Sequence, residues 1–145
     1  MSEIIHEVPE LVTVTWEEHL RAIVIRWDTL YREDAAVRDA LEFCFDYVRR
    51  NEVKNWVADV SAAKAQMSAA DEQWSDQYFI KTLATLGLNI FVLVTAPSKA
   101  GEASPIEEWM EGARREIGGS LAMLHATSMD EVRTIIYDGA SSPEG

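Results

Sequence analysis

The sequence predicts an α/β protein built on a mixed, mostly parallel five-stranded sheet with an antiparallel hairpin at its N-terminal end. Two β-type stretches precede the first helical pattern, and each later apolar strand is separated from the next by an amphipathic stretch. The order is therefore β-β-α-β-α-β-α-β-α, and right-handed crossovers would make the later strands parallel. The 145 residues fit one domain, placed at residues 1–138, with a flexible tail at residues 139–145.

The predicted hairpin joins residues 11–16 to residues 19–27. The first stretch, LVTVTW, alternates apolar residues with threonine, and the second, HLRAIVIRW, is rich in β-branched residues. Only Glu17 and Glu18 lie between them, which predicts a tight turn. The residues before the hairpin are expected to form an N-terminal arm that contains His6.

The first helix is predicted over residues 34–50. Its apolar residues recur at spacings of four, three and four, which is typical of a helix with one buried side. They are Val37, Leu41, Cys44 and Val48. The charged residues between them, Arg38 among them, are expected to face solvent, and the single cysteine is expected to be an inert, buried thiol.

The middle of the chain predicts a strand over residues 53–60 and a helix over residues 68–86. Ser68 and Asp71 have the spacing of a capping box at the start of that helix. Gly87 stands where the end of a helix favours a left-handed residue.

The last third of the chain predicts two more strands, each followed by a helix. The stretch 89–96 is almost wholly apolar, as in a strand covered on both faces. Ser104 and Pro105 open a helix over residues 104–117, and Ser128 caps a final helix that follows a strand over residues 120–126. That last helix is predicted to end at Tyr137.

Composition limits the partners that the chain can have. Thirteen basic and 25 acidic residues give a net charge of −12, which disfavours nucleic acid and anionic membrane surfaces. The longest apolar run is far too short to span a bilayer, so no membrane insertion is expected. The N-terminus lacks the features of a signal peptide, and the prediction is a cytoplasmic protein.

The sequence offers no constellation typical of metal binding or catalysis. The three histidines have no ligand spacing and no cysteine partner, so no metal and no cofactor are predicted. A triad of Ser61 or Ser68 with His125 lacks the G-x-S-x-G turn that would expose a nucleophile. We expect a protein that is not an enzyme.

Several short motifs occur along the chain: Trp27 at the end of the second strand, Trp56 and Asp59 in the third, Ser68 and Trp74 in the helix after it, and Asp130 and Glu131 in the last helix. These motifs resemble those of STAS domains, which share the SpoIIAA-like fold, and more narrowly those of stand-alone bacterial STAS-like or lipid-transfer (CRAL-TRIO)-like proteins. The resemblance covers about residues 10–138. It implies a sheet with strands in near-sequential order, and a role as an interaction or regulatory module.

In anti-sigma-factor antagonists of this type, a serine at the start of the helix after the third strand is phosphorylated, which switches partner binding. The matching position is Ser68. Those proteins carry Asp-Ser-Ser-Gly there, whereas this chain carries Met-Ser-Ala-Ala at residues 67–70. Ser68 is therefore a candidate phospho-acceptor with a plain capping role as the alternative.

Two residues at the end of the third predicted strand are further candidates. Asp59 lies where ligands collect in open α/β sheets, but a sequential sheet has no reversal of strand order at that point. The alternative is that Asp59 accepts backbone N–H bonds from the loop that follows, as aspartate often does. Ser61 is a loop hydroxyl beside it.

The aromatic residues suggest an interaction or ligand surface. Trp74 and Tyr78 lie four residues apart in a predicted helix, and Trp109 could join them from the next helix, although such spacing favours core packing. The first hypothesis is a surface for another protein, or for a second copy of this chain. The second is a carrier of a small apolar or amphipathic ligand in a cleft between helices 68–86 and 104–117.

Overall fold

The computed structural model describes residues 2–29, 36–63, 69–95, 103–117 and 121–140. In chain order the strands and helices are β1 (Ser2–Val8), β2 (Val12–Glu17), β3 (Ala22–Trp27), α1 (Ala36–Arg50), β4 (Asn55–Asp59), α2 (Ala69–Trp74), α3 (Ile80–Leu83), β5 (Ile90–Val94), α4 (Ala103–Ile117), β6 (Ala122–Ala126) and α5 (Met129–Ala140). A 3₁₀ turn, η1 (Glu18–Leu20), joins β2 to β3, and a π-helical segment, η2 (Ser75–Phe79), joins α2 to α3.

Within the described residues, the strands form one six-stranded sheet in the sequential order β1-β2-β3-β4-β5-β6. β1, β2 and β3 pair antiparallel, and β3, β4, β5 and β6 pair parallel. The α/β class and the N-terminal hairpin are confirmed, and the sequential order agrees with what the resemblance implies.

The prediction of five strands was wrong because the N-terminal arm forms β1. The register shifts between Ile4 and His6, where a β-bulge interrupts the ladder with β2. Such a bulge breaks the alternation of apolar and polar residues that identifies a strand in a sequence. The adjacent Ile4 and Ile5, preceded by Glu3 and followed by His6, therefore gave no strand pattern.

The turn of the second hairpin is longer than predicted. Residues 18–20 form a 3₁₀ turn, and Arg21 adopts a left-handed conformation with φ of 49° before β3 begins at Ala22. The strand expected from His19 therefore starts three residues later. Lys54 and Asn55 then donate their backbone N–H groups to the carbonyl of Arg21, which fixes β4 beside β3.

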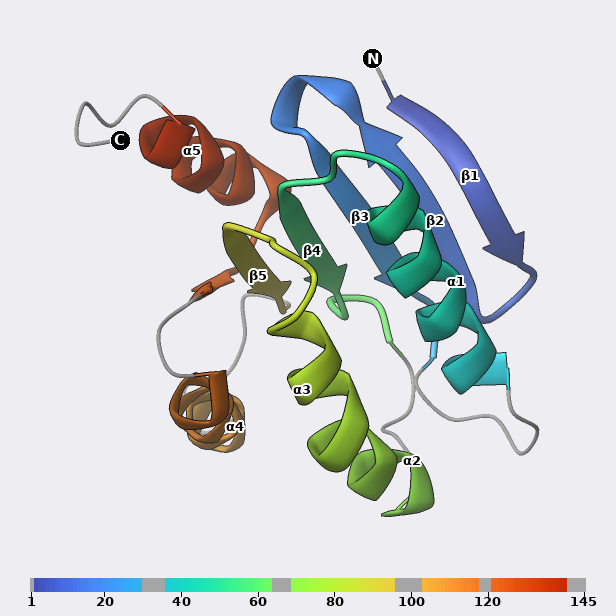
Figure 1. Cartoon of the computed structure of the whole chain (residues 1–145), viewed down its shortest axis with the longest axis vertical. Helices are drawn as coiled ribbons and strands as arrows, with labels where there is room; N and C mark the ends of the chain where they lie inside the picture. Colours follow the sequence, from blue (N-terminus) through green and yellow to red (C-terminus); the bar gives the residue numbers. More distant parts are fainter. Residues whose placement is uncertain (1, 30–35, 64–68, 96–102, 118–120, 141–145) are drawn as a thin grey trace.

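Helices pack against both faces of the sheet. One core cluster joins residues of α1, α3 and α4 to one face, and a second cluster joins α5 to the other. Figure 1 shows α1 in front of β2 and β3, with α3 between α1 and α4. Parallel strands added in one direction through right-handed crossovers place successive helices on the same face, which is the arrangement seen.

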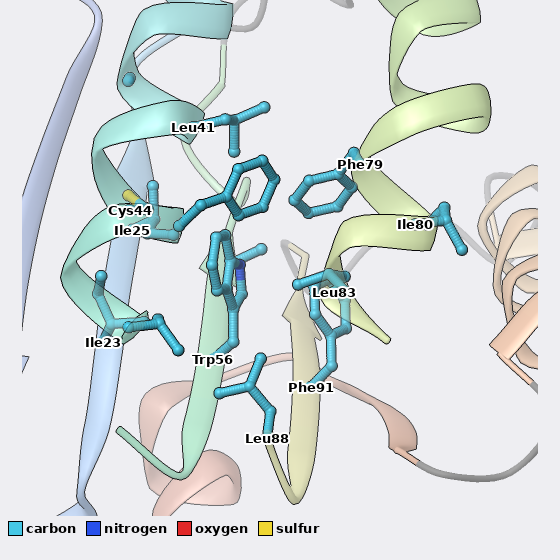
Figure 2. Packing of buried hydrophobic residues seen from close by; sticks show 14 of the residues in the cluster. Ile23, Ile25, Leu41, Cys44, Trp56, Phe79, Ile80, Leu83, Leu88 and Phe91 are labelled. Carbon is cyan, nitrogen blue, oxygen red and sulfur yellow. The ribbon is translucent and has the colours of Figure 1, made fainter. Parts of the chain in front are cut away.

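The main core is centred on Trp56, which is fully buried in β4. Its ring lies 5.7 Å from those of Phe45 in α1 and Phe79 in η2, measured between ring centroids. Figure 2 shows Leu83 and Phe91 closing the same cluster from α3 and β5. These contacts fix α1 and the α2–α3 helix against the middle of the sheet.

The helix predicted over residues 68–86 is described from Ala69 to Leu83 and contains the π segment η2. A π segment adds a residue to one turn, which shifts the helical phase of the residues that follow. Phe79 and Leu83 are buried, whereas Tyr78 is 39% exposed. Gly87 has the left-handed φ of 75° that was predicted, in the turn residues after the helix.

Candidate functional site

The carboxylate of Asp59 organises the loop at the end of β4. Its Oδ1 accepts hydrogen bonds from the backbone N–H of Ser61, at 3.0 Å, and from the Ser61 hydroxyl, at 2.6 Å. The alternative that Asp59 orients the following loop is therefore confirmed. Ser61 donates to Asp59, so this hydroxyl is part of the turn.

A cation that sequence reasoning missed lies beside the same carboxylate. The register pairs Arg26 of β3 with Asp59 of β4, and the Arg26 Nε lies 3.6 Å from Asp59 Oδ2. Asp59 is buried while the Arg26 side chain is largely exposed. The burial of this carboxylate is thus compensated by two hydrogen bonds and an ion pair.

Trp74 and Tyr78 meet on the side of the α2–η2 helix that faces α1. Their ring centroids lie 5.2 Å apart with the rings tilted by 39°. Trp74 is half-buried and Tyr78 is the more exposed of the two. The sequence prediction that these rings share one side of a helix is confirmed: Trp74 packs against the core, and Tyr78 is partly exposed.

Arg38 of α1 completes this surface from the neighbouring helix. Its Nε donates to Asp71 Oδ1 at 2.8 Å, and its guanidinium carbon lies 5.7 Å from the centre of the Trp74 ring. Arg38 was expected to face solvent, but its side chain is only 38% exposed because it lies across α2. We call Arg38, Asp71, Trp74 and Tyr78 the Trp74 surface.

The Trp74 surface rests on the core through Phe45. The rings of Phe45 and Tyr78 meet edge to face at 6.0 Å, and Phe45 also packs against Phe79. One side of Tyr78 is therefore anchored while the other reaches solvent. Each ring of the Trp74 surface thus contacts a second ring.

Two of the predicted site residues are not tested by these contacts. Ser68 lies outside the described residues, and α2 begins at the next residue, Ala69. Trp109 lies in α4, but its side chain is outside the described part of the structure. α3 and α4 are neighbours, so the expected pairing of these helices is confirmed.

His125 has a partner that the sequence did not indicate. Its Nε2 lies 2.7 Å from the hydroxyl oxygen of Thr95, which directly follows β5. The two residues meet because β5 and β6 are parallel neighbours and Leu93 pairs with His125. Ser61 is hydrogen-bonded to Asp59 instead, so this geometry does not support the triad drawn with Ser61.

The indole N–H of Trp56 has no hydrogen-bond partner among the residues that the structure describes. Figure 2 places this ring beside Phe79 and Leu83, in apolar surroundings. A buried donor without an acceptor costs about 1–3 kcal/mol.

In the described part of the chain, no group of three or more His, Cys, Asp or Glu side chains is placed to hold a metal ion. No helix among the described residues is both long and apolar enough to cross a bilayer. Cys44 is fully buried, as predicted, and burial raises the pKa of its thiol.

Compared with known proteins, the chain matches no family model, no curated protein and no solved structure.

Proposed function

We propose that this protein is a non-catalytic, STAS-like regulatory module that binds another protein through the Trp74 surface. The observation that carries the proposal is the half-exposed Trp74–Tyr78 pair with Arg38 held over it. Tryptophan, tyrosine and arginine are the residues most enriched among those that dominate binding energies at protein interfaces. The sequential sheet with helices stacked on one face is compatible with the STAS-like part of the proposal.

Preorganisation supports a binding role for these side chains. Asp71 holds the Arg38 guanidinium at 2.8 Å, and Phe45 holds Tyr78 from below. Side chains that are already ordered lose less conformational entropy when a partner binds, where each freely rotating side chain would lose about 0.5–1.5 kcal/mol. The partner therefore meets a fixed aromatic face.

Charge favours a partner of different composition over a second copy. Each copy carries a net charge of −12, so two copies repel each other at low ionic strength. A partner with a basic surface would instead be attracted. Self-association through the Trp74 surface is the competing outcome of the test.

Substitution of Trp74 by alanine and of Tyr78 by serine tests the proposal. Proteins captured from the host by the wild type would be purified, and their affinity for each variant would be measured by calorimetry. Tyr137→Ser is the matched control, because Tyr137 is 49% exposed but lies in α5, on the other side of the sheet. Loss of binding in Trp74→Ala and Tyr78→Ser alone supports the proposal, and equal binding by all variants contradicts it.

Ser68 gives this proposal a route for regulation. The residue precedes α2 directly, and a phosphate there would lie near the helix N-terminus and a few residues from Asp71 and Trp74. Mass spectrometry of protein isolated from its host would detect an added phosphate. A phosphate mapped to Ser68 supports a switch, and an unmodified Ser68 in every growth condition contradicts it.

A second candidate function is favoured by the unpaired N–H of Trp56. In this alternative the protein carries a small amphipathic ligand that enters beside the α2–α3 helix and offers an acceptor to that N–H. Native mass spectrometry distinguishes the two functions. A copurified small molecule that is lost in Trp56→Phe supports the carrier, and a bare chain of the expected mass contradicts it.

A further inference from the structure

A second group of aromatic side chains lies on the opposite flank of α1. The rings of His6 in β1 and Phe43 in α1 stack with centroids 4.3 Å apart and an interplanar angle of 16°. The ring of Tyr47, one turn along α1, has its centroid 6.4 Å from that of Phe43 and 6.1 Å from that of Trp16 in β2. The four rings therefore form a row to which β1, β2 and α1 all contribute.

All four rings are half-buried, so each is held in place by the core and still reaches the surface. Phe43 and Tyr47 project from one flank of α1, whereas Arg38 and Phe45 project from the other. This row is therefore separate from the Trp74 surface. None of its members takes part in the contacts that carry the proposed function.

A carboxylate lies beside the exposed end of this row. The register pairs Glu3 of β1 directly with Trp16 of β2, and paired residues of neighbouring strands point to the same face of a sheet. Burial raises the pKa of the Tyr47 hydroxyl, and the negative charge of Glu3 raises it further. Glu3, Trp16 and Tyr47 thus face one another from three elements; we call them the Trp16 site.

This combination has a recognisable chemical preference. The faces of tryptophan and tyrosine rings attract cations, and a carboxylate at their edge adds a full negative charge. Asp39, one turn before Phe43, is also exposed, while Arg50 lies three residues after Tyr47 at the end of α1. The carboxylate that acts on these rings is that of Glu3 in β1.

We propose that the Trp16 site binds a lysine or arginine side chain presented by a partner protein. The net charge of −12 draws a basic partner, and the two rings with Glu3 receive its cationic group. A protein side chain is favoured over a free cation because the site lies open beside the edge strand β1, where a partner surface has access. The inference goes beyond the proposed function, since it concerns a different surface.

The test uses two synthetic peptides of the same length, one with arginine and one with the neutral isostere citrulline at the same positions. Tryptophan indole N–H signals are followed by NMR as each peptide is added at constant ionic strength. The Trp16 signal, assigned through Trp16→Leu, should shift with the arginine peptide and much less with the citrulline peptide. Glu3→Gln should weaken the binding of the arginine peptide about tenfold.

Glu7→Gln is the matched control. It removes the same charge from the same strand, but Glu7 pairs with Thr13 and so points to the other face of the sheet. Tyr47→Phe keeps the aromatic ring and should bind the arginine peptide like the wild type. Equal loss of affinity in Glu3→Gln and Glu7→Gln would show a general charge effect and overturn the proposal.

Two further outcomes also overturn it. Equal binding of the arginine and citrulline peptides would show that no cation is recognised. Tetramethylammonium that shifts the Trp16 signal at lower concentrations than the arginine peptide would assign the site to a small cation and not to a protein side chain. Loss of binding in Trp74→Ala has no bearing on these results, so the two proposals fail independently.

Discussion

Asp59 at the end of β4 is the clearest case of a single side chain that determines local structure. It is buried, accepts two hydrogen bonds from Ser61 and lies beside Arg26. Replacing it by alanine leaves the Ser61 N–H and hydroxyl without their acceptor. We expect Asp59→Ala to lower the free energy of unfolding by about 2 kcal/mol, measured by urea denaturation.

The control for this prediction is Arg26→Gln. An ion pair in which one partner is largely exposed contributes at most about 1 kcal/mol, so this variant should unfold at nearly the same urea concentration as the wild type. If Arg26→Gln were as unstable as Asp59→Ala, the ion pair rather than the loop hydrogen bonds would hold Asp59.

Cys44 leads to a prediction about reactivity. Its thiol is fully buried in α1, and burial raises its pKa, so little thiolate forms at neutral pH. A thiol reagent such as Ellman's reagent should therefore label the native protein very slowly and the urea-unfolded protein at once. Rapid labelling of the native protein would mean that α1 separates readily from the core.

Residue roles could be predicted only where they depend on nearby sequence. The turn contact between Asp59 and Ser61 spans two positions, and the sequence indicated it. The contacts of Arg26 with Asp59 and of Arg38 with Trp74 join residues that are more than 30 positions apart. They depend on strand register and helix packing, which a single sequence does not specify.

At the scale of elements, the start of α5 carries the most complete helix cap among the described residues. Ser128 Oγ accepts the N–H of Glu131 at 3.2 Å, as the sequence predicted. The Glu131 carboxylate in turn accepts the N–H of Thr127 at 2.6 Å and its hydroxyl at 3.0 Å. Ser128→Ala should lower the free energy of unfolding by about 1 kcal/mol.

The same cap gives a prediction about pH. The backbone N–H of Thr127, followed by its hydroxyl, holds the pKa of Glu131 below its usual value. A lowered pKa stabilises the folded state at neutral pH, and this stabilisation is lost as the pH falls through the folded-state pKa. Stability measured between neutral and acidic pH should fall less in Glu131→Gln than in the wild type; parallel curves would contradict this role.

Two elements escaped prediction for a shared reason. The bulge in β1 and the π segment η2 each insert one residue into a regular repeat. Strands and helices are identified in a sequence because apolar residues recur every 2 residues in a strand and every 3.6 residues in a helix. An inserted residue therefore either hides the element or shifts the phase of the pattern. The remaining helices keep one period throughout, and their positions were predicted within a few residues.

At the scale of the whole molecule, α1 occupies a central place. One flank of this helix supplies Arg38 to the Trp74 surface, and the other supplies Tyr47 to the Trp16 site. Its buried stripe packs on the sheet between them. The fold thus presents two separate aromatic surfaces from one rigid helix, and a partner could engage either one alone.

The architecture was largely predictable because it follows from the order of apolar strands and amphipathic helices. The composition of the Trp74 surface was predictable in part: Trp74 and Tyr78 share a helix, whereas Arg38 comes from another. The identity of the partner was not predictable, because recognition depends on the sequence and structure of a second molecule.

The most direct test of the account is the affinity of a purified partner, obtained from the host with the wild-type protein, for Trp74→Ala and for Tyr137→Ser. We predict that Trp74→Ala weakens binding at least about tenfold, as loss of a central aromatic residue does at protein interfaces, and that Tyr137→Ser binds like the wild type. Circular dichroism would establish that both variants remain folded. Equal affinities for the two variants, or no protein captured by the wild type, would contradict a binding role for the Trp74 surface.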